Sequence, residues 1–219
     1  ASSTGQVQWK IDSKLKGDER LIERVAGRTF RISGGGFWQV HKKAAEVLSS
    51  AVTEMVAAVG IDKEADNLDL YGGVGLFSGA LAAKFGTDLR ITSVESFRQA
   101  TDDATLNLSD LPKVKAVCAP VERFLNEKVG NLDKGGKTAS PRNSTIVLDP
   151  PRAGAGAKVV DAIVKSQPKH IVYVACDPVA LARDLKGLLA GGYELVELRA
   201  FDLFPHTHHV EAIASLVRK

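Results

Sequence analysis

The sequence predicts an α/β protein built on a doubly wound, mostly parallel sheet. From residue 67 onward, short apolar segments alternate with amphipathic ones, a pattern typical of strands buried between two layers of helices. Loops rich in glycine or proline follow several of the apolar segments, and such sheets bind ligands beyond the carboxyl ends of their strands. The 219 residues suffice for one large domain with a sizeable core.

Composition excludes several classes of protein. The hydrophobic fraction of 44% and the charged fraction of 25% are ordinary for a soluble globular chain. No apolar run approaches the length of a membrane span, and the N-terminus has no signal architecture. Two cysteines favour a reducing, cytoplasmic setting. Three histidines near the C-terminus lack a second ligand cluster, so we expect no metal. The net charge of +3 permits a polyanionic partner without requiring one.

The elements before residue 67 are a short β region and one long helix. Polar and apolar residues alternate at 7–12 and 29–33, which predicts two strands with a charged, irregular segment between them. Glycines at 34–36 then break the chain. Residues 37–60 carry apolar side chains at helical spacing, which predicts one amphipathic helix ending near Gly60.

The elements after residue 67 alternate regularly. We expect strands at 67–71, 89–95, 114–120, 144–150 and 170–176, and helices at 76–86, 97–108, 121–130, 157–166 and 178–192. Lys, Gly and Ser enrich 131–144, which indicates a flexible surface loop. Segments 193–202 and 210–219 predict two closing strands, the last of them antiparallel to the parallel set.

A glycine-rich loop after the first strand of this series indicates an adenosine cofactor. Gly73 and Gly75 allow a sharp turn and a close approach of the backbone to a ligand. Glu95 ends the next strand, 20 residues past Gly75, where a carboxylate can bind ribose hydroxyls. Ser78 nearly completes a dinucleotide fingerprint. The chain shows no separate substrate domain, so S-adenosylmethionine, which has no pyrophosphate, fits better than a dinucleotide.

The segment Asp149-Pro150-Pro151-Arg152 follows an apolar strand. Its two prolines fix the backbone and remove two N–H donors, so the turn is stiff. Amino-group methylases use a similar turn followed by an aromatic residue that stacks on the target base. Here Arg152 takes that place, and arginine suits phosphate or carboxylate instead. A rigid turn with a solvated arginine stays open.

Cys176 lies at the end of a strand and just before a helix. Asp177 suits the N-cap and Pro178 the first helical position. The helix dipole there lowers a thiol pKa whereas Asp177 raises it, so nucleophile and packed core residue are both open interpretations. Cys118, in the middle of a strand, is read as a core residue. Glu211 begins the last strand and is either functional or a solvated charge.

Six segments together carry a resemblance to a known family. In chain order they are FWQVHKKAAEVL, DLYGGVGLF, VES, LDPPRAGAG, YVACDPVALARDL and DLFPHTHHVE. They resemble the RNA (uracil-5-)-methyltransferase family, which forms 5-methyluridine in transfer or ribosomal RNA. The resemblance implies a class I, Rossmann-like methyltransferase domain at 36–219, with 1–35 a β remnant of a linking region. It also implies an RNA partner and a catalytic fragment that needs an N-terminal RNA-binding barrel.

The resemblance implies a role for each site residue. Cys176 would add to C6 of the uridine, and Glu211 would remove the C5 proton. Asp149 and Arg152 would contact the substrate. The residues expected around S-adenosylmethionine are Gln39, Tyr71, Gly73, Gly75, Leu76, Glu95 and Asp149.

Two other functions compete with this one. An amino-group methyltransferase would need Asp149 but not Cys176. A non-catalytic module would bind S-adenosylmethionine or RNA without turnover.

Overall fold

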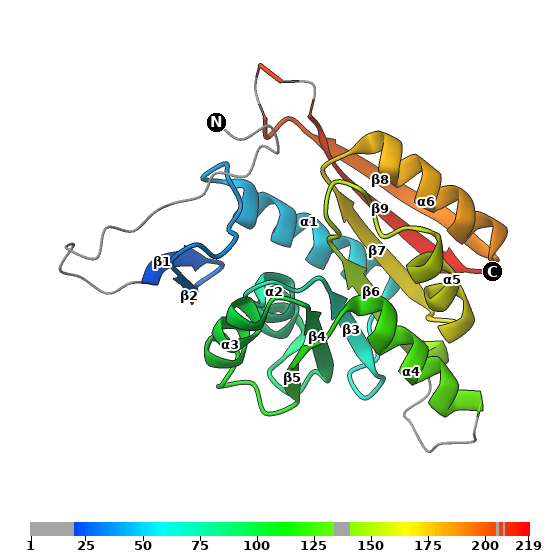
Figure 1. Ribbon diagram of the computed structural model, residues 1–219, viewed down its shortest axis with the longest axis horizontal. Coiled ribbons are helices and arrows are strands. Elements are labelled where there is room, and N and C mark those ends of the chain that lie inside the picture. Colours follow the sequence, from blue (N-terminus) through cyan, green and yellow to red (C-terminus); the bar gives the residue numbers. More distant parts are fainter. Residues whose placement is uncertain (1–19, 134–140, 205, 208) are drawn as a thin grey trace.

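A seven-stranded sheet in the order β5-β4-β3-β6-β7-β9-β8 forms the centre of the computed structural model, which describes residues 20–133, 141–204, 206–207 and 209–219 (Figure 1). Strands β3 to β7 run parallel, and β9 lies antiparallel between β7 and β8. This confirms the predicted doubly wound sheet with an antiparallel closing strand. The strands are β3 (Asn67–Leu70), β4 (Ile91–Glu95), β5 (Val114–Cys118), β6 (Thr145–Leu148), β7 (His170–Ala175), β8 (Tyr193–Phe201) and β9 (Glu211–Arg218).

Helices cover both faces of the sheet because its strands are apolar on both sides. Along β6, Val147 packs toward α1 and α2, whereas Ile146 and Leu148 pack toward α4, α5 and α6. Helix α3 packs beside α2. From β3 the chain adds β4 and β5 on one side of the sheet, and it then adds β6 and β7 on the other side. The carboxyl ends of β3 and β6 are therefore the switch point of the fold. The helices are α1 (Ala44–Val59), α2 (Leu76–Phe85), α3 (Arg98–Asn107), α4 (Val121–Asp133), α5 (Ala157–Ser166) and α6 (Pro178–Ala190).

Three local expectations were wrong or only partly right. The charged segment expected to be irregular contains β1 (Arg20–Val25), which pairs with β2 (Arg28–Ser33). Helix α1 begins at Ala44 and not at residue 37, and residues 37–43 are irregular. The expected loop at 131–144 is helical through Asp133 and again in the 3-10 turn Pro141–Asn143. The strand expected at 7–12 and residues 134–140 lie outside the described residues.

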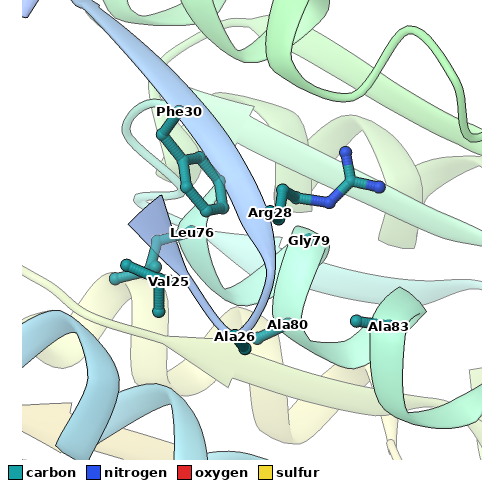
Figure 2. Close-up of a pocket in the computed structure, with 8 residues that line it drawn as sticks. All are labelled: Val25, Ala26, Arg28, Phe30, Leu76, Gly79, Ala80 and Ala83. Atoms are coloured by element: carbon teal, nitrogen blue, oxygen red, sulfur yellow. The ribbon is translucent and has the colours of Figure 1, made fainter. Parts of the chain in front are cut away.

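The β1–β2 hairpin packs on α2 at a glycine. Figure 2 shows Phe30 and Arg28 of β2 above Leu76 and Gly79 of α2. A Cβ atom at Gly79 would lie 2.8 Å from Cδ of Arg28 and 3.1 Å from Cζ of Phe30, so a larger residue there would push the hairpin outward. Phe30 is buried in a cluster with Leu76 and Val74. The hairpin is therefore packed against the start of α2 and the loop that precedes it.

None of the helices in the described part of the chain is both long enough and apolar enough to cross a membrane.

Candidate active site

The ends of β6, β7 and β9 bring together side chains that are far apart in the sequence. Ala175 pairs with Ala212 in the antiparallel β7–β9 ladder, so Cys176 and Glu211 are the next residues along the two strands. Leu148 pairs with Tyr173, so Asp149 leaves β6 beside the end of β7. The sheet register therefore sets Asp149, Cys176 and Glu211 at one edge of the fold.

Two carboxyl groups at this edge, one buried and one half-buried, hold their protons more tightly than usual. Glu211 is 5% exposed, and burial raises its pKa to about 7. Burial raises the pKa of Asp149 to about 8, with further contributions from the charges of Glu211 and Asp69. The side-chain amide of Gln39 donates to Oδ2 of Asp149 at 3.5 Å, which acts in the opposite direction. Both groups can therefore exchange protons near neutral pH.

Cys176 lies between β7 and α6 with its thiol half-buried. Oδ1 of Asp177 accepts from the Ala180 amide at 2.8 Å, and Pro178 occupies the first turn, so the predicted helix start is confirmed. Burial raises the pKa of the thiol, as do the charges of Glu211 and Asp149, whereas Arg152 lowers it. A bound substrate that offsets the two carboxylates would favour the thiolate.

The glycine-rich loop faces the carboxylate of β4. The Gly73 amide donates to Oε2 of Glu95 at 3.2 Å, and the Phe97 amide donates to Oε1 at 2.7 Å. Gly73 and Gly75 adopt φ of 53° and 90°, which an L side chain rarely adopts. A Cβ atom at Gly75 would also lie 2.7 Å from Cδ1 of Leu108. The loop thus places backbone amides beside a carboxylate, which fits the ribose of an adenosine ligand.

Tyr71 and Leu76 flank this loop in different ways. Tyr71 follows the last residue of β3 with φ of 61°, a costly conformation for a tyrosine, and burial raises its pKa to about 12. Leu76 is 7% exposed and packs in the cluster with Phe30 and Ile32 of the hairpin. The side chain of Leu76 therefore supports the loop from behind.

Asp69 is a buried acid at the site that the sequence analysis did not single out. Its Oδ2 accepts from both the amide and the hydroxyl of Ser78, at 3.0 and 2.6 Å. Its Oδ1 has no hydrogen-bond partner among the described residues, and burial raises its pKa to about 6. A buried oxygen without a partner at the base of a ligand loop is unusual. The sequence contains a sign of this role, because Asp69 places a carboxylate within the otherwise largely apolar strand NLDLY.

A second missed residue, Asp184 of α6, holds the loop that carries Arg152. Asp184 is 2% exposed and accepts from the Tyr173 hydroxyl at 2.7 Å and from the Ala155 amide at 2.8 Å. Nη2 of Arg183 donates to the Ala153 carbonyl at 2.7 Å. These bonds join α6, which starts after Cys176, to the loop after β6. These hydrogen bonds therefore hold the loop that carries Arg152 in a fixed position relative to the helix that follows Cys176.

Replacing Asp184 with alanine is expected to lower the free energy of unfolding by about 1–3 kcal/mol, because the buried Tyr173 hydroxyl loses its acceptor. The Ala155 amide loses one of its two acceptors and keeps the Tyr173 oxygen, at 2.9 Å. Urea unfolding measures the change. The control is Asp161→Ala, at an exposed position on α5, which should stay within about 0.5 kcal/mol of wild type. Equal unfolding midpoints for the two variants would contradict a role for Asp184 in holding the loop.

Comparison with known proteins gives concordant matches. The family described as tRNA (Uracil-5-)-methyltransferase matches residues 18–219. An uncharacterized RNA methyltransferase of Streptomyces avermitilis is 46% identical over 204 residues, which cover 93% of this chain and 44% of the relative. One from Thermotoga maritima is 35% identical over 206 residues, 93% of this chain and 43% of the relative. The chain thus spans less than half the length of these curated relatives.

A solved structure shows the same arrangement of elements. The Pyrococcus abyssi tRNA (uracil-54, C5)-methyltransferase, in complex with S-adenosyl-L-homocysteine, superposes with a TM-score of 0.75 at 28% identity. The match covers 99% of this chain and 49% of that protein. Since the family match spans nearly the whole chain, this chain belongs to the tRNA (uracil-5-)-methyltransferase family.

Proposed function

We propose that this chain is the catalytic part of an S-adenosylmethionine-dependent enzyme that methylates C5 of a uridine in transfer or ribosomal RNA. The observation that carries the proposal is that Cys176 and Glu211 lie one residue beyond the paired Ala175 and Ala212, at the ends of β7 and β9. The charges of Glu211 and Asp149 both act on the Cys176 thiol. A thiol next to a carboxyl group of raised pKa supplies a nucleophile and a base in one place. Membership of the family supports the same reaction.

The residues around the glycine-rich loop fit the methyl donor. Glu95 would bind the ribose hydroxyls, and the backbone of Gly73 to Gly75 would approach the amino-acid part of the donor. The unpartnered Oδ1 of Asp69 offers a further acceptor close to this loop. When bound, S-adenosylmethionine supplies an electrophilic methyl group. The related Pyrococcus enzyme holds the demethylated product of this donor, which supports the assignment.

The proposed reaction needs a covalent step because C5 of uracil is a weak nucleophile. The Cys176 thiolate adds to C6, and the electron pair of the C5–C6 double bond forms an enolate. C5 can then attack the methyl group, whose bond to the donor sulfur would break with its electron pair staying on sulfur. C5 then carries both a proton and a methyl group. Glu211 removes the proton, the double bond re-forms, and the thiolate leaves with its electron pair.

The electrostatics of the site suit these roles. A base works best when its pKa lies near the working pH, and burial sets that of Glu211 at about 7. Because the pKa of Cys176 is raised, its thiol stays protonated in the free protein, while the charge of Arg152 favours the thiolate. Asp149, with its pKa at about 8, can donate a hydrogen bond to a carbonyl of the base in its neutral form. Addition to C6 requires the uridine to be unstacked from its neighbours.

The test is transfer of a labelled methyl group from S-adenosylmethionine to unmodified tRNA and ribosomal RNA, read by mass spectrometry of the nucleosides. We expect 5-methyluridine, and a rate that rises between about pH 6 and 8 because Glu211, whose pKa burial raises to about 7, must lose its proton. The rate should keep rising above pH 8, because burial and the nearby carboxylates raise the pKa of the Cys176 thiol. An RNA whose uridines all carry a C5 methyl group is the control and should accept no label.

Three other outcomes would contradict the proposal. Methyl groups found on exocyclic nitrogens would favour an amino-group methyltransferase acting through Asp149 and its proline turn. Binding of the donor without transfer to either RNA would favour a non-catalytic module. A rate that falls over the same pH range would remove the carboxylate form of Glu211 from the reaction.

A further inference from the structure

Two side chains of α3 hold the free edge of β2 in the hairpin. Asp103 and Asn107 are four residues apart and so lie on one face of the helix. Asp103 accepts from the amide and the hydroxyl of Ser33, both at 2.8 Å. Asn107 accepts from the Arg31 amide at 2.8 Å and donates to the Arg31 carbonyl at 3.0 Å. Asn107 therefore bonds the backbone of β2 in the way that a neighbouring strand would.

Asn107 also reaches the glycine-rich loop. Its Nδ2 donates to the carbonyl of Val74 at 3.1 Å, and Val74 lies between Gly73 and Gly75. Both hydrogens of the amide are thus used, one on the hairpin and one on the loop, which fixes its orientation. The residue is 5% exposed, so water does not readily replace these bonds.

Apolar packing joins the same three parts of the chain. Val74 and Leu76, on either side of Gly75, are buried in one cluster with Phe30 and Ile32 of β2. Ala100 of α3 belongs to the same cluster. The loop thus rests on the hairpin through its side chains, while Asn107 connects the two through the backbone. A displacement of the hairpin would remove support from the loop.

We propose that Asn107 is a positioning residue that couples the hairpin to the cofactor loop, so that cofactor binding and hairpin docking strengthen each other. The inference rests on the cofactor assignment of the proposed function. Such coupling is reciprocal: what steadies the loop steadies the hairpin by the same factor. Segments that contact the hairpin would then sense whether the methyl donor is bound.

The first test is calorimetric titration of the 219-residue chain with S-adenosylhomocysteine. Asn107→Ala should weaken binding about 3- to 10-fold, because the loop loses a buried hydrogen bond and its tie to the hairpin. Asp103→Ala is the matched control. It removes two bonds to the same strand from the same helix but none to the loop, and should change affinity less than about twofold.

The second test measures the effect of the ligand on the hairpin, by amide hydrogen exchange at Ser33 of β2. S-adenosylhomocysteine should slow this exchange in wild type, and Asn107→Ala should abolish the dependence although the Asp103 bond to Ser33 remains. If that variant does not fold, Asn107→Asp serves instead, because it keeps an acceptor for the Arg31 amide and loses the donor to Val74.

The outcomes separate this inference from the proposed function. Wild type that does not bind S-adenosylhomocysteine overturns the cofactor assignment. Wild type that binds, with unchanged affinity in the Asn107 variant or equal losses in both variants, overturns the coupling alone. Ligand-independent exchange at Ser33 in wild type overturns the coupling without the need for any variant.

Discussion

Cys176→Ala is expected to abolish methyl transfer while leaving the affinity for S-adenosylhomocysteine within about twofold of wild type. Without a nucleophile at C6 the uracil ring stays unreactive at C5, so the rate should fall by at least about 10⁴-fold, more than about 5 kcal/mol in barrier height. Cys176 lies beside Glu211 and Asp149, whereas the proposed cofactor contacts are Glu95 and the glycine-rich loop. The variant therefore separates chemistry from binding.

The measurement is the intact mass of the protein under denaturing conditions, after incubation with S-adenosylmethionine and a short RNA that contains 5-fluorouridine. Fluorine cannot leave as a cation, so the methylated adduct stays on the thiol. Cys118→Ala is the matched control, since it removes the other cysteine of the chain. Cys118 was expected to be a core residue, but it is exposed at the end of β5. An adduct that survives Cys176→Ala, or one that needs Cys118, would refute the assignment.

Glu211→Gln is expected to permit methyl transfer but to trap the RNA on the protein. Glutamine fills the same space and cannot take the C5 proton, so the thiolate is not expelled. General bases contribute roughly 10²–10⁴-fold, which sets the expected slowing of release. The covalent complex should accumulate with ordinary uridine RNA, and should appear as a slow-migrating band on a denaturing gel.

The control for this change is Glu194→Gln, at an exposed carboxylate on the neighbouring strand β8. It should release methylated RNA at the wild-type rate. Normal release by Glu211→Gln would show that another group takes the proton, and Asp149 would be the next candidate because its pKa is raised by burial and by Glu211 itself.

Much of the fold could be predicted because its signals are local. Residues 157–166 were expected to be a helix, and α5 spans Ala157–Ser166. Strands β6 and β7 are buried on both faces and lie just before the Asp-Pro pairs at 149–150 and 177–178, so each was visible within its own segment. Strand β1 was missed because its charged residues lie on an open hairpin, where pairing with β2 decides the conformation.

Some residues of the candidate site could also be predicted from local sequence patterns, and others could not. Cys176, Asp149 and Glu95 could be selected from the sequence because each follows or ends an apolar strand, and parallel strands end at one edge. Asp184 and Asn107 could not, because their importance depends on partners 29 and 76 residues away. The raised pKa of Glu211 likewise requires burial, and that of Asp149 requires burial and the proximity of Glu211, which no local pattern contains.

The sequence by itself determined the doubly wound sheet, the family and the strand ends that carry reactive side chains, since periodicity and short motifs act within a few residues. Only the tertiary structure decided which of those side chains meet, how strongly each holds its proton, and how α3 joins the hairpin to the cofactor loop. Those properties arise from contacts between distant segments, where burial and hydrogen bonding depend on the whole fold.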